Sequence, residues 1–593
     1  MSPEQTSGSA ALDGRSDQYS LACVLFEMLA GEPPFTGPTA EVVMHQHLTA
    51  PVPSVTQLRP AVAPGTARAI SRALSKASAD RYASAGAFAR ELVAARPEVG
   101  SDAGARPRHR PWMAAVLLVV AAVLGAGALL TWRGRQGDGR MRTVAVLPLA
   151  NLSGDADQLY FADGMTEELI GALSQASGLL VISHTSVMGY RERPKPMREI
   201  ARELGVGSVV EGSVRRQGTR VRITANLVDA AHDRRIWSET FERETKDVMA
   251  LQVEVARVIA ERIRVRITPA ERRRLSRARV VDPRAHDAYI RGRVLLDRVD
   301  EMNYVKALAA FEEALRIDPG YAEAWAGLAE THYRVSSLFR PANEAMPKAR
   351  AAAERALSLD PELGDAEAVL GVVRGMYEWQ WSDAERHFRR ALELRPNSVS
   401  AHSNYALTLV CQRRFDEGLA HWRAAEELDP LSQYLHSGRA YWLYIAGRTG
   451  EAEASAREAL LRDSTYVVNW YNLAQIEMDQ GRFGEAVRSA QRAVDVLDSP
   501  YTRAGLAVMY GRAGRLVEAR RELRSLEGAG GRVQLIYRAR VHANLGDKTR
   551  AFELLDRAVQ EHEEELALLN VDPFFKPLHG DPRFDALVRR LHL

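Results

Sequence analysis

The stretch AERHFRRALELRP, residues 384–396, decides how the C-terminal half of this 593-residue chain folds. Its small residue Ala391 recurs as Ala425, Ala459 and Ala493, each 34 positions after the one before. A fixed period of this length is typical of stacked helix pairs, because a single pair cannot bury its own apolar face. Alanine at these positions lets two helices approach closely. The sequence therefore predicts an all-α solenoid in this half.

The same period is the mark of tetratricopeptide repeats, and residues 285–565 resemble an array of about eight of them. Ala314 and Ala356 are 42 residues apart, so one repeat is expected to hold an insertion near residues 336–346. The concave face of such an array commonly binds an extended peptide or a helix, and we expect a protein or peptide ligand there. Residues 566–593 are expected to cap the open end of the solenoid with one last helix.

A second stretch predicts a membrane span. Residues 112–132, WMAAVLLVVAAVLGAGALLTW, carry no charged side chain. An α-helix of this length spans roughly 30 Å, the thickness of the hydrocarbon core of a bilayer. Tryptophans at both ends and arginines on both flanks are typical of the two interfaces. We predict one transmembrane helix, with a juxtamembrane linker rich in Gly, Pro and Arg before it at residues 96–111. The alternative is a buried Ala-rich helix of a water-soluble domain.

Residues 1–95 predict a small all-α unit whose motifs resemble the C-lobe of protein kinases. Ser2-Pro3-Glu4 is similar to the A-P-E motif that closes the activation segment. The run SDQYSL at residues 16–21 resembles the start of the large buried helix, and KASADRY at residues 76–82 resembles the motif at the end of the domain. These motifs identify the unit as a C-lobe fragment of a bacterial receptor-type Ser/Thr kinase.

The kinase resemblance assigns structural roles to three residues. Glu4 and Arg81 are implied to form a buried ion pair, and Asp17 to hydrogen-bond the backbone of the catalytic loop. The sequence departs from the family at Ala22, where glycine is usual, and at Ser78, where proline is usual. Both departures are expected to change only local packing.

Kinase chemistry needs four motifs that this sequence does not contain: the Gly-rich loop, the lysine of the third strand, H-R-D and D-F-G. We therefore expect no catalytic residue, no cofactor site and no metal site, with ATP and Mg²⁺ bound only by a full-length parent Ser/Thr kinase. Because related kinases often have an internal methionine before S-P-E, Met1 is expected to mark a late start codon or a truncated gene.

Residues 142–268 predict an α/β domain with the element order β-α-β-α-β-β-β-α. Residues 142–148 form a β-branched run that stops at proline, and Gln217-Gly218 predicts the turn of a hairpin. Asp163 is expected to cap the helix that follows it. His184 and His232 stand alone and are expected to be surface or hydrogen-bonded residues and not metal ligands.

Three stretches of this domain resemble the TolB-like amino-terminal domain found in bacterial signalling proteins, including receptor kinases and adenylate cyclases. They are VAVLP at residues 144–148, FADGMTE at residues 161–167 and VVEGSV at residues 209–214. The resemblance brings no catalytic residue with it.

The net charge, the two cysteines and the arginines beside the predicted span bear on the partners of the chain and on its orientation in the membrane. A formal net charge of +3 gives no argument for a nucleic-acid partner, and none is expected. Cys23 and Cys411 lie on opposite sides of the predicted span, so no disulfide framework is implied. The flanking arginines are nearly balanced, so they do not orient the span; the kinase resemblance places the N-terminus in the cytoplasm.

These features predict a multidomain chain: an α-helical kinase C-lobe fragment, a single transmembrane helix, an α/β TolB-like domain and an all-α tetratricopeptide-repeat solenoid. We expect a single-pass signalling protein of the bacterial inner membrane, with the C-terminal domains outside the cytoplasm. Its expected partners are the lipid bilayer and a protein or peptide ligand, with a homodimer as one option. A second hypothesis is a non-enzymatic envelope scaffold with a vestigial kinase remnant, and a third keeps the repeats in the cytoplasm.

Overall fold

The computed structural model describes residues 2–6, 14–31, 33–35, 40–60, 62–94, 143–153, 158–263, 268–275, 281–296, 300–528 and 533–593. The described residues form two compact units, one up to residue 94 and one from residue 143 onward. The predicted linker and transmembrane helix at residues 96–132 lie outside the described residues. Within the described residues, no helix is long and apolar enough to cross a bilayer.

The N-terminal unit is helical. Its elements are α1 (Pro3–Thr6), α2 (Gly14–Ala30), α3 (Ala40–Thr49), α4 (Val55–Leu58), α5 (Pro64–Ala73), η1 (Ser78–Asp80) and α6 (Ala85–Ala94). Tyr19 and Phe26 of α2 are fully buried, and they pack with Ile70 of α5 and Phe88 of α6. The helix α2 ends at Ala30, and the next residue, Gly31, has a positive φ of 87° that glycine readily adopts.

The second unit begins with a mixed sheet in the strand order β3-β1-β4-β5-β6. Its strands are β1 (Thr143–Val146), β2 (Ala150–Asn151), β3 (Leu180–Val181), β4 (Ser208–Gln217), β5 (Arg220–Asp229) and β6 (Arg234–Glu244). Strand β1 runs parallel to both of its neighbours, β3 and β4, whereas β4, β5 and β6 are antiparallel to one another in turn. The predicted turn at Gln217-Gly218 does join β4 to β5, and Gly218 has a φ of 58°.

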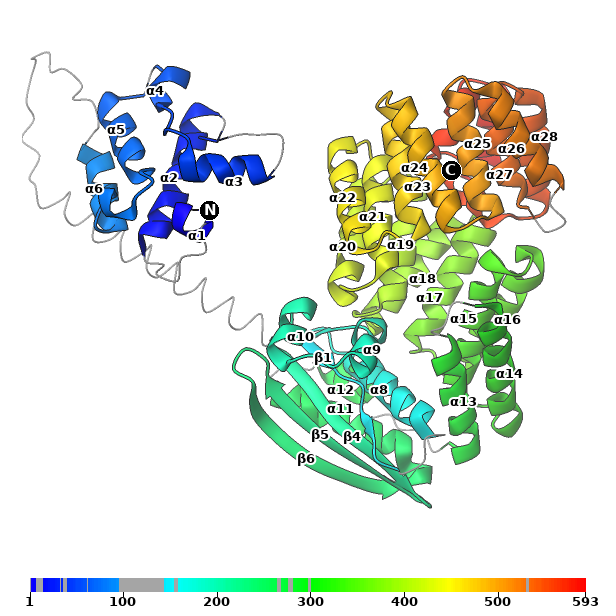
Figure 1. Cartoon of the computed structure of the whole chain (residues 1–593). Coiled ribbons are helices and arrows are strands. Elements are labelled where there is room, and N and C mark those ends of the chain that lie inside the picture. The colour runs from blue at the N-terminus through cyan, green and yellow to red at the C-terminus, as the bar shows by residue number, and fades with distance from the viewer. Residues whose placement is uncertain are drawn as a thin grey trace, which may run out of the picture. The chain divides into compact units, whose positions relative to one another are not determined.

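Helices α8 (Leu159–Leu173) and α11 (Val248–Arg262) pack on each other and against the sheet (Figure 1). They cover the face that carries the buried side chains of β5, while α9 (His184–Glu192) and α10 (Met197–Leu204) connect β3 to β4. The prediction for Asp163 was wrong. The helix α8 already begins at Leu159, so Asp163 lies inside it and pairs with Arg191 of α9.

The repeat region contains eight helix pairs within the described residues, stacked side by side (Figure 1). The pairs are α13 (Pro283–Leu296) with α14 (Glu301–Ile317), α15 (Ala322–Leu338) with α16 (Ala342–Leu359), α17 (Gly364–Val372) with α18 (Trp381–Leu394), α19 (Val399–Cys411) with α20 (Phe415–Leu428), α21 (Gln433–Ile445) with α22 (Thr449–Arg462), α23 (Val467–Asp479) with α24 (Phe483–Val496), α25 (Pro500–Arg512) with α26 (Leu516–Gly528), and α27 (Leu535–Asn544) with α28 (Lys548–Gln560). The first helices of successive pairs contact one another and form the inner layer of the array. The extra residues predicted near 336–346 lengthen α15 and α16 to 17 and 18 residues, against 13 and 14 in α19 and α20.

The C-terminal segment was expected only to cap the last helix pair. In the structure it also contacts earlier repeats. It forms η5 (Glu564–Leu568), η6 (Pro573–Leu578) and α29 (Pro582–Arg590), and it returns to the third repeat. The indole Nε1 of Trp381 donates to the carbonyl of Leu591 at 2.9 Å. His562 stacks on Trp379 with ring centroids 4.8 Å apart.

The same segment also contacts the inner layer of the later repeats. Arg540 of α27 donates to Asp572 at 2.7 Å, and both residues are buried. The ring of Phe574 lies 6.1 Å from that of Tyr471 on α23. Residues 561–578 thus occupy much of the inner face where the sequence led us to expect a ligand.

Close helix packing in the array depends on glycine opposite large side chains. Trp422 of α20 is 1% exposed, and its Nε1 donates to the carbonyl of Leu435 at 2.9 Å. A Cβ atom on Gly438 of α21 would lie 2.1 Å from the Trp422 ring. That distance is far inside van der Waals contact, so the helix at this point tolerates only glycine.

We expect Gly438→Ala to lower the free energy of unfolding by about 1–3 kcal/mol, because the added methyl group overpacks a rigid ring. Chemical denaturation of the full chain, followed by circular dichroism, measures the change. Gly450→Ala in α22 is the matched control, since nothing lies within 4 Å of its added Cβ. The control should be neutral or stabilising by up to about 1 kcal/mol. Equal effects of the two substitutions would contradict this account of the packing.

Candidate binding site

The structure brings together two of the three residues that the kinase resemblance singled out. Arg81 is 2% exposed and donates to both carboxylate oxygens of Glu4, at 2.7 and 2.9 Å. The hydroxyl of Ser16 donates to the same carboxylate at 2.6 Å. The hydrogen bond from Arg81 lowers the pKa of Glu4 to about 2, against the opposing effect of burial. Asp17 is exposed on α2 and takes no part in this pair.

We expect Arg81→Met to destabilise the N-terminal unit by about 3–5 kcal/mol, because Glu4 would then be a half-buried charge without its partner. In the unmodified chain the pair should stabilise the unit fully above pH about 4.5 and lose this effect as the pH falls toward about 2. Hydrogen exchange of α2 and α6 in the full chain measures both effects. Retained protection in Arg81→Met would contradict the role of the pair.

Neither histidine considered in the sequence belongs to a metal cluster. His232 Nδ1 lies 2.9 Å from Asp229 Oδ2, and its side chain is 75% exposed. Across the described part of the chain, no group of three His, Cys, Asp or Glu residues is placed to hold a metal ion.

The α/β domain docks on the first repeat through α8 and α13. A Cβ atom on Gly164 of α8 would lie 2.2 Å from the side chain of Ile290, so the two helices touch at this glycine. The Tyr289 hydroxyl donates to Glu168 at 3.0 Å. Arg293 donates through Nε to Glu167 at 2.8 Å, which joins α13 to α8 by a charged hydrogen bond.

A second set of contacts fixes the same domain to the third and fourth repeats. The backbone amide of Ser183 donates to the Leu428 carbonyl at 2.8 Å, and the Ser186 hydroxyl donates to Asp429 at 2.5 Å. The side-chain amide of Asn397 donates to the carbonyls of Ser174 and Ala176, each at 3.3 Å. The domain is therefore held at two separated places along the array.

A hollow of about 170 Å³, here called the junction pocket, lies between the two places. Its lining comes from α8, α11 and α12 (Pro269–Leu275) of the α/β domain and from α13, α15, α17 and α18 of the repeats, together with residues next to these helices. The lining includes three guanidinium groups, those of Arg274, Arg293 and Arg395. It also includes six carboxylates, those of Glu167, Glu168, Glu323, Asp360, Glu362 and Asp365. Negative charge is therefore in excess.

Arg293 lies at the centre of the charges around this pocket. It pairs with Glu167 on one side and with Glu330 of α15 on the other, at 2.9 Å from Nη1 to Glu330. Arg334 also pairs with Glu330. Burial by itself would raise the pKa of Glu330, but Arg334 and Arg293 lower it to about 2. Arg395 is paired with Asp365 in the same way.

Glu168 has a different environment. Its pKa is raised to about 7, chiefly by burial and also by the neighbouring charge of Glu167, while Arg293 opposes both. The hydrogen bond from Tyr289 favours the ionised form. The carboxyl of Glu168 therefore changes its charge near neutral pH, and a cation placed beside it would stabilise the ionised form.

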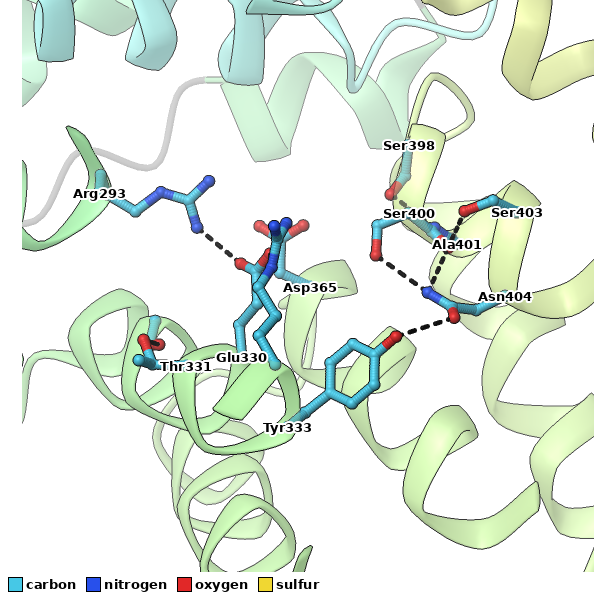
Figure 2. Close-up of polar contacts among 12 residues, drawn as sticks. Arg293, Glu330, Thr331, Tyr333, Asp365, Ser398, Ser400, Ala401, Ser403 and Asn404 are labelled. Carbon is cyan, nitrogen blue, oxygen red and sulfur yellow. Dashed lines mark hydrogen bonds and ion pairs between the residues drawn. The ribbon is translucent and has the colours of Figure 1, made fainter. Parts of the chain in front are cut away.

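The polar surface continues along the inner layer. Figure 2 shows Arg293, Glu330 and Asp365 close together, with Tyr333 of α15 reaching Asn404 of α19. The Tyr333 hydroxyl donates to Asn404 at 3.1 Å, and Asn404 donates to the Ser400 carbonyl at 2.9 Å. The start of the array thus presents ordered polar groups, and the C-terminal segment reaches this region too, since the Ser336 hydroxyl of α15 donates to Glu564.

None of these junction residues was predicted as part of a site. Glu167 falls in the FADGMTE stretch, but its partner Arg293 is 126 residues later in the chain. Only the density of charged residues on an otherwise apolar repeat surface could have drawn attention to them.

Two different protein families match two different segments of the chain. The second domain of the HilA/YgeH-like transcriptional regulator family matches residues 140–258. The tetratricopeptide-repeat family matches residues 471–531. The chain contains tetratricopeptide repeats. The name TolB-like stays a prediction for the α/β domain, because the family that matches there is described differently.

Three of the curated relatives are named as a putative adenylate cyclase and two serine/threonine-protein kinases. The chain is 41% identical over 186 residues to "Putative adenylate cyclase 3" of Rhizobium meliloti. This match covers 31% of this chain and 32% of that protein. It is 31% identical over 186 residues to the DNA damage-responsive serine/threonine-protein kinase RqkA of Deinococcus radiodurans. This match covers 31% of this chain and 25% of that protein. It is 45% identical over 100 residues to the serine/threonine-protein kinase pkn3 of Myxococcus xanthus. This match covers 16% of this chain and 18% of that protein. The chain thus spans about a third or less of the length of these relatives.

Among solved structures, the human IFIT1 dimer with m7Gppp-AAAA is 18% identical, with a TM-score of 0.37, and the match covers 52% of this chain and 77% of that one. A likeness this weak carries no argument about function.

Proposed function

We propose that this kinase-related chain is a receptor of the bacterial Ser/Thr-kinase type, and that its junction pocket binds a basic segment of a partner protein. The kinase-named relatives and the repeat array support the general class. The observation that carries the choice of partner is the excess of carboxylates over guanidinium groups in the junction pocket.

The size of the junction pocket favours a side chain over a free small molecule. Sites for small molecules usually measure about 300–1,000 Å³, whereas a cavity of about 150 Å³ holds a group the size of benzene. The junction pocket, at about 170 Å³, fits one lysine or arginine side chain. Such a cation would compensate the buried charge of Glu168 at little cost, because the carboxylates are already positioned.

The position of the pocket also fits this function. Residues 561–578 cover much of the inner face of the later repeats and also reach α15, where Ser336 donates to Glu564, so the junction pocket itself is the place proposed for the ligand segment. There the segment would contact the α/β domain and the repeats together. A bound segment would therefore favour the docked arrangement of these two parts, as linkage requires of a receptor that responds to its ligand.

The membrane is part of the proposal. We propose that residues 112–132 span the bacterial inner membrane once, with the kinase-like unit in the cytoplasm and the repeats outside it. The span is supported by its length and its lack of charge.

Alkaline phosphatase fused after Leu593 tests the topology, because this enzyme is active only outside the cytoplasm. An active fusion is expected. An inactive fusion, together with activity from a cytoplasmic reporter at the same position, would place the repeats inside and contradict this topology.

The ligand class can be tested with the full chain and three fluorescent Gly-Ser peptides that carry lysines, glutamates or glutamines at the same positions. We expect the lysine peptide to bind most tightly, with affinity rising as the pH increases through about 7, because only ionised Glu168 attracts the cation. Glu168→Gln should weaken binding about five- to tenfold at pH 8 and abolish this pH dependence. Fluorescence polarisation measures both.

Glu393→Gln is the matched control for the peptide experiment. Glu393 lies on α18 with its side chain 65% exposed, and it pairs with Arg390 outside the pocket. This variant should bind the lysine peptide as the unmodified chain does. Equal binding of all three peptides, or equal behaviour of the two variants, would contradict the proposed function.

A further inference from the structure

A second hollow, of about 480 Å³, lies within the α/β domain. It is bounded by Leu147 and Pro148 after β1, by the connection from α9 to α10, and by the open faces of β4 and β5. Its volume falls within the range of about 300–1,000 Å³ that is usual for small-molecule sites. We call it the switch-point pocket.

The sheet topology places this pocket where α/β proteins commonly bind ligands. From β1 the chain passes through α8 to β3 on one side of β1, and then through α9 and α10 to β4 on its other side. The connections therefore change direction around β1, and a crevice opens at its carboxyl end. Leu147 and Pro148, which line the pocket, are the residues that follow this end.

One side of the pocket is apolar and the other carries hydrogen-bond donors. Leu147, Pro148, Tyr190, Met197 and Ile200 line the first side. The donors are the side chains of Arg191, Lys195, Ser213, Thr224 and Asn226, and Glu211 is the one carboxylate in the lining.

Two of these donors have unused capacity. Asn226 accepts from Ser238 at 2.7 Å through its Oδ1, which orients its amide nitrogen as a donor. The Nε atom of Arg191 is buried and has no hydrogen-bond partner among the described residues. A buried donor left unpaired is costly, so an acceptor oxygen on a ligand would be favoured here.

The charge of the pocket limits what that acceptor can be. Arg191 is already paired with Asp163, and Lys195 lies 2.6 Å from Glu203. Lys195 also pairs with Glu199, and Glu211 lines the pocket, so carboxylates offset both cations. The attraction for an acceptor therefore comes from the Arg191 Nε and Asn226 donors and not from net charge. This favours a ligand with one negative charge, and it disfavours a polyphosphate.

We propose that the switch-point pocket binds a small organic monocarboxylate, with the carboxylate beside Arg191 and Asn226 and the apolar body against Tyr190 and Ile200. The α/β domain would then sense a small molecule, independently of the peptide segment bound at the junction pocket.

Ligand-detected NMR on the full chain tests this with isovalerate and phenylacetate, each compared with its primary amide and its matched amine. The carboxylates should bind, the amides more weakly, and the amines least. Absence of binding by both carboxylates at millimolar concentration, or stronger binding by the amines, would overturn the proposal.

Two variants locate the binding. Asp163→Asn combined with Arg191→Gln removes the guanidinium without leaving a charge unpaired, and it should weaken binding about tenfold or more. Asn226→Leu should weaken binding about fivefold. Arg257→Gln, on the exposed side of α11 where Arg257 pairs with Glu261, is the control and should bind like the unmodified chain. Unchanged binding in both pocket variants, with circular dichroism showing an intact fold, would overturn the assignment.

Discussion

A buried charge must be paired, and this constraint determines how the second unit of the chain is assembled. Arg293 on the first repeat helix is nearly enclosed, with only 19% of its side chain exposed. Its guanidinium is neutralised by Glu330 of the repeats and by Glu167 of the α/β domain. Removing the α/β domain would leave one face of this charge without a partner. The domain and the array are for this reason parts of one structure, and the polar pocket between them follows from the same pairing.

Local regularities predicted much of the fold. The 34-residue spacing of Ala391, Ala425, Ala459 and Ala493 predicted helix pairs, because close packing needs a small residue at the same place in every repeat. The alternating pattern of the α/β domain predicted its hairpin at Gln217-Gly218. These elements depend on residues near one another in the chain, and such residues leave a readable pattern. The prediction that Asp163 caps a helix was wrong because a capping residue and an internal residue that pairs with a distant arginine look alike in sequence.

Contacts between distant residues could not be predicted in this way. Glu167 and Arg293 meet across 126 residues, and Trp381 and Leu591 across 210. Neither pair has a period or a spacing that marks it. The sequence predicted a ligand on the concave face of the array but not which residues line that face, and the structure places residues 561–578 against the inner helices of the later repeats. The junction pocket and the switch-point pocket both arise from side chains of several elements, and only the three-dimensional arrangement shows that they converge.

The return of the C-terminal segment to the third repeat changes how the array should come apart. In an open solenoid each repeat touches only its neighbours, so the terminal repeats fray first and unfolding spreads inward. Here the hydrogen bond from Trp381 to Leu591 and the stacking of His562 on Trp379 tie the last residues to the interior of the array. The end that would fray first is fastened to the middle. Loss of order in the final repeats therefore requires loss of contacts in the third, and the two regions should unfold as a single cooperative block.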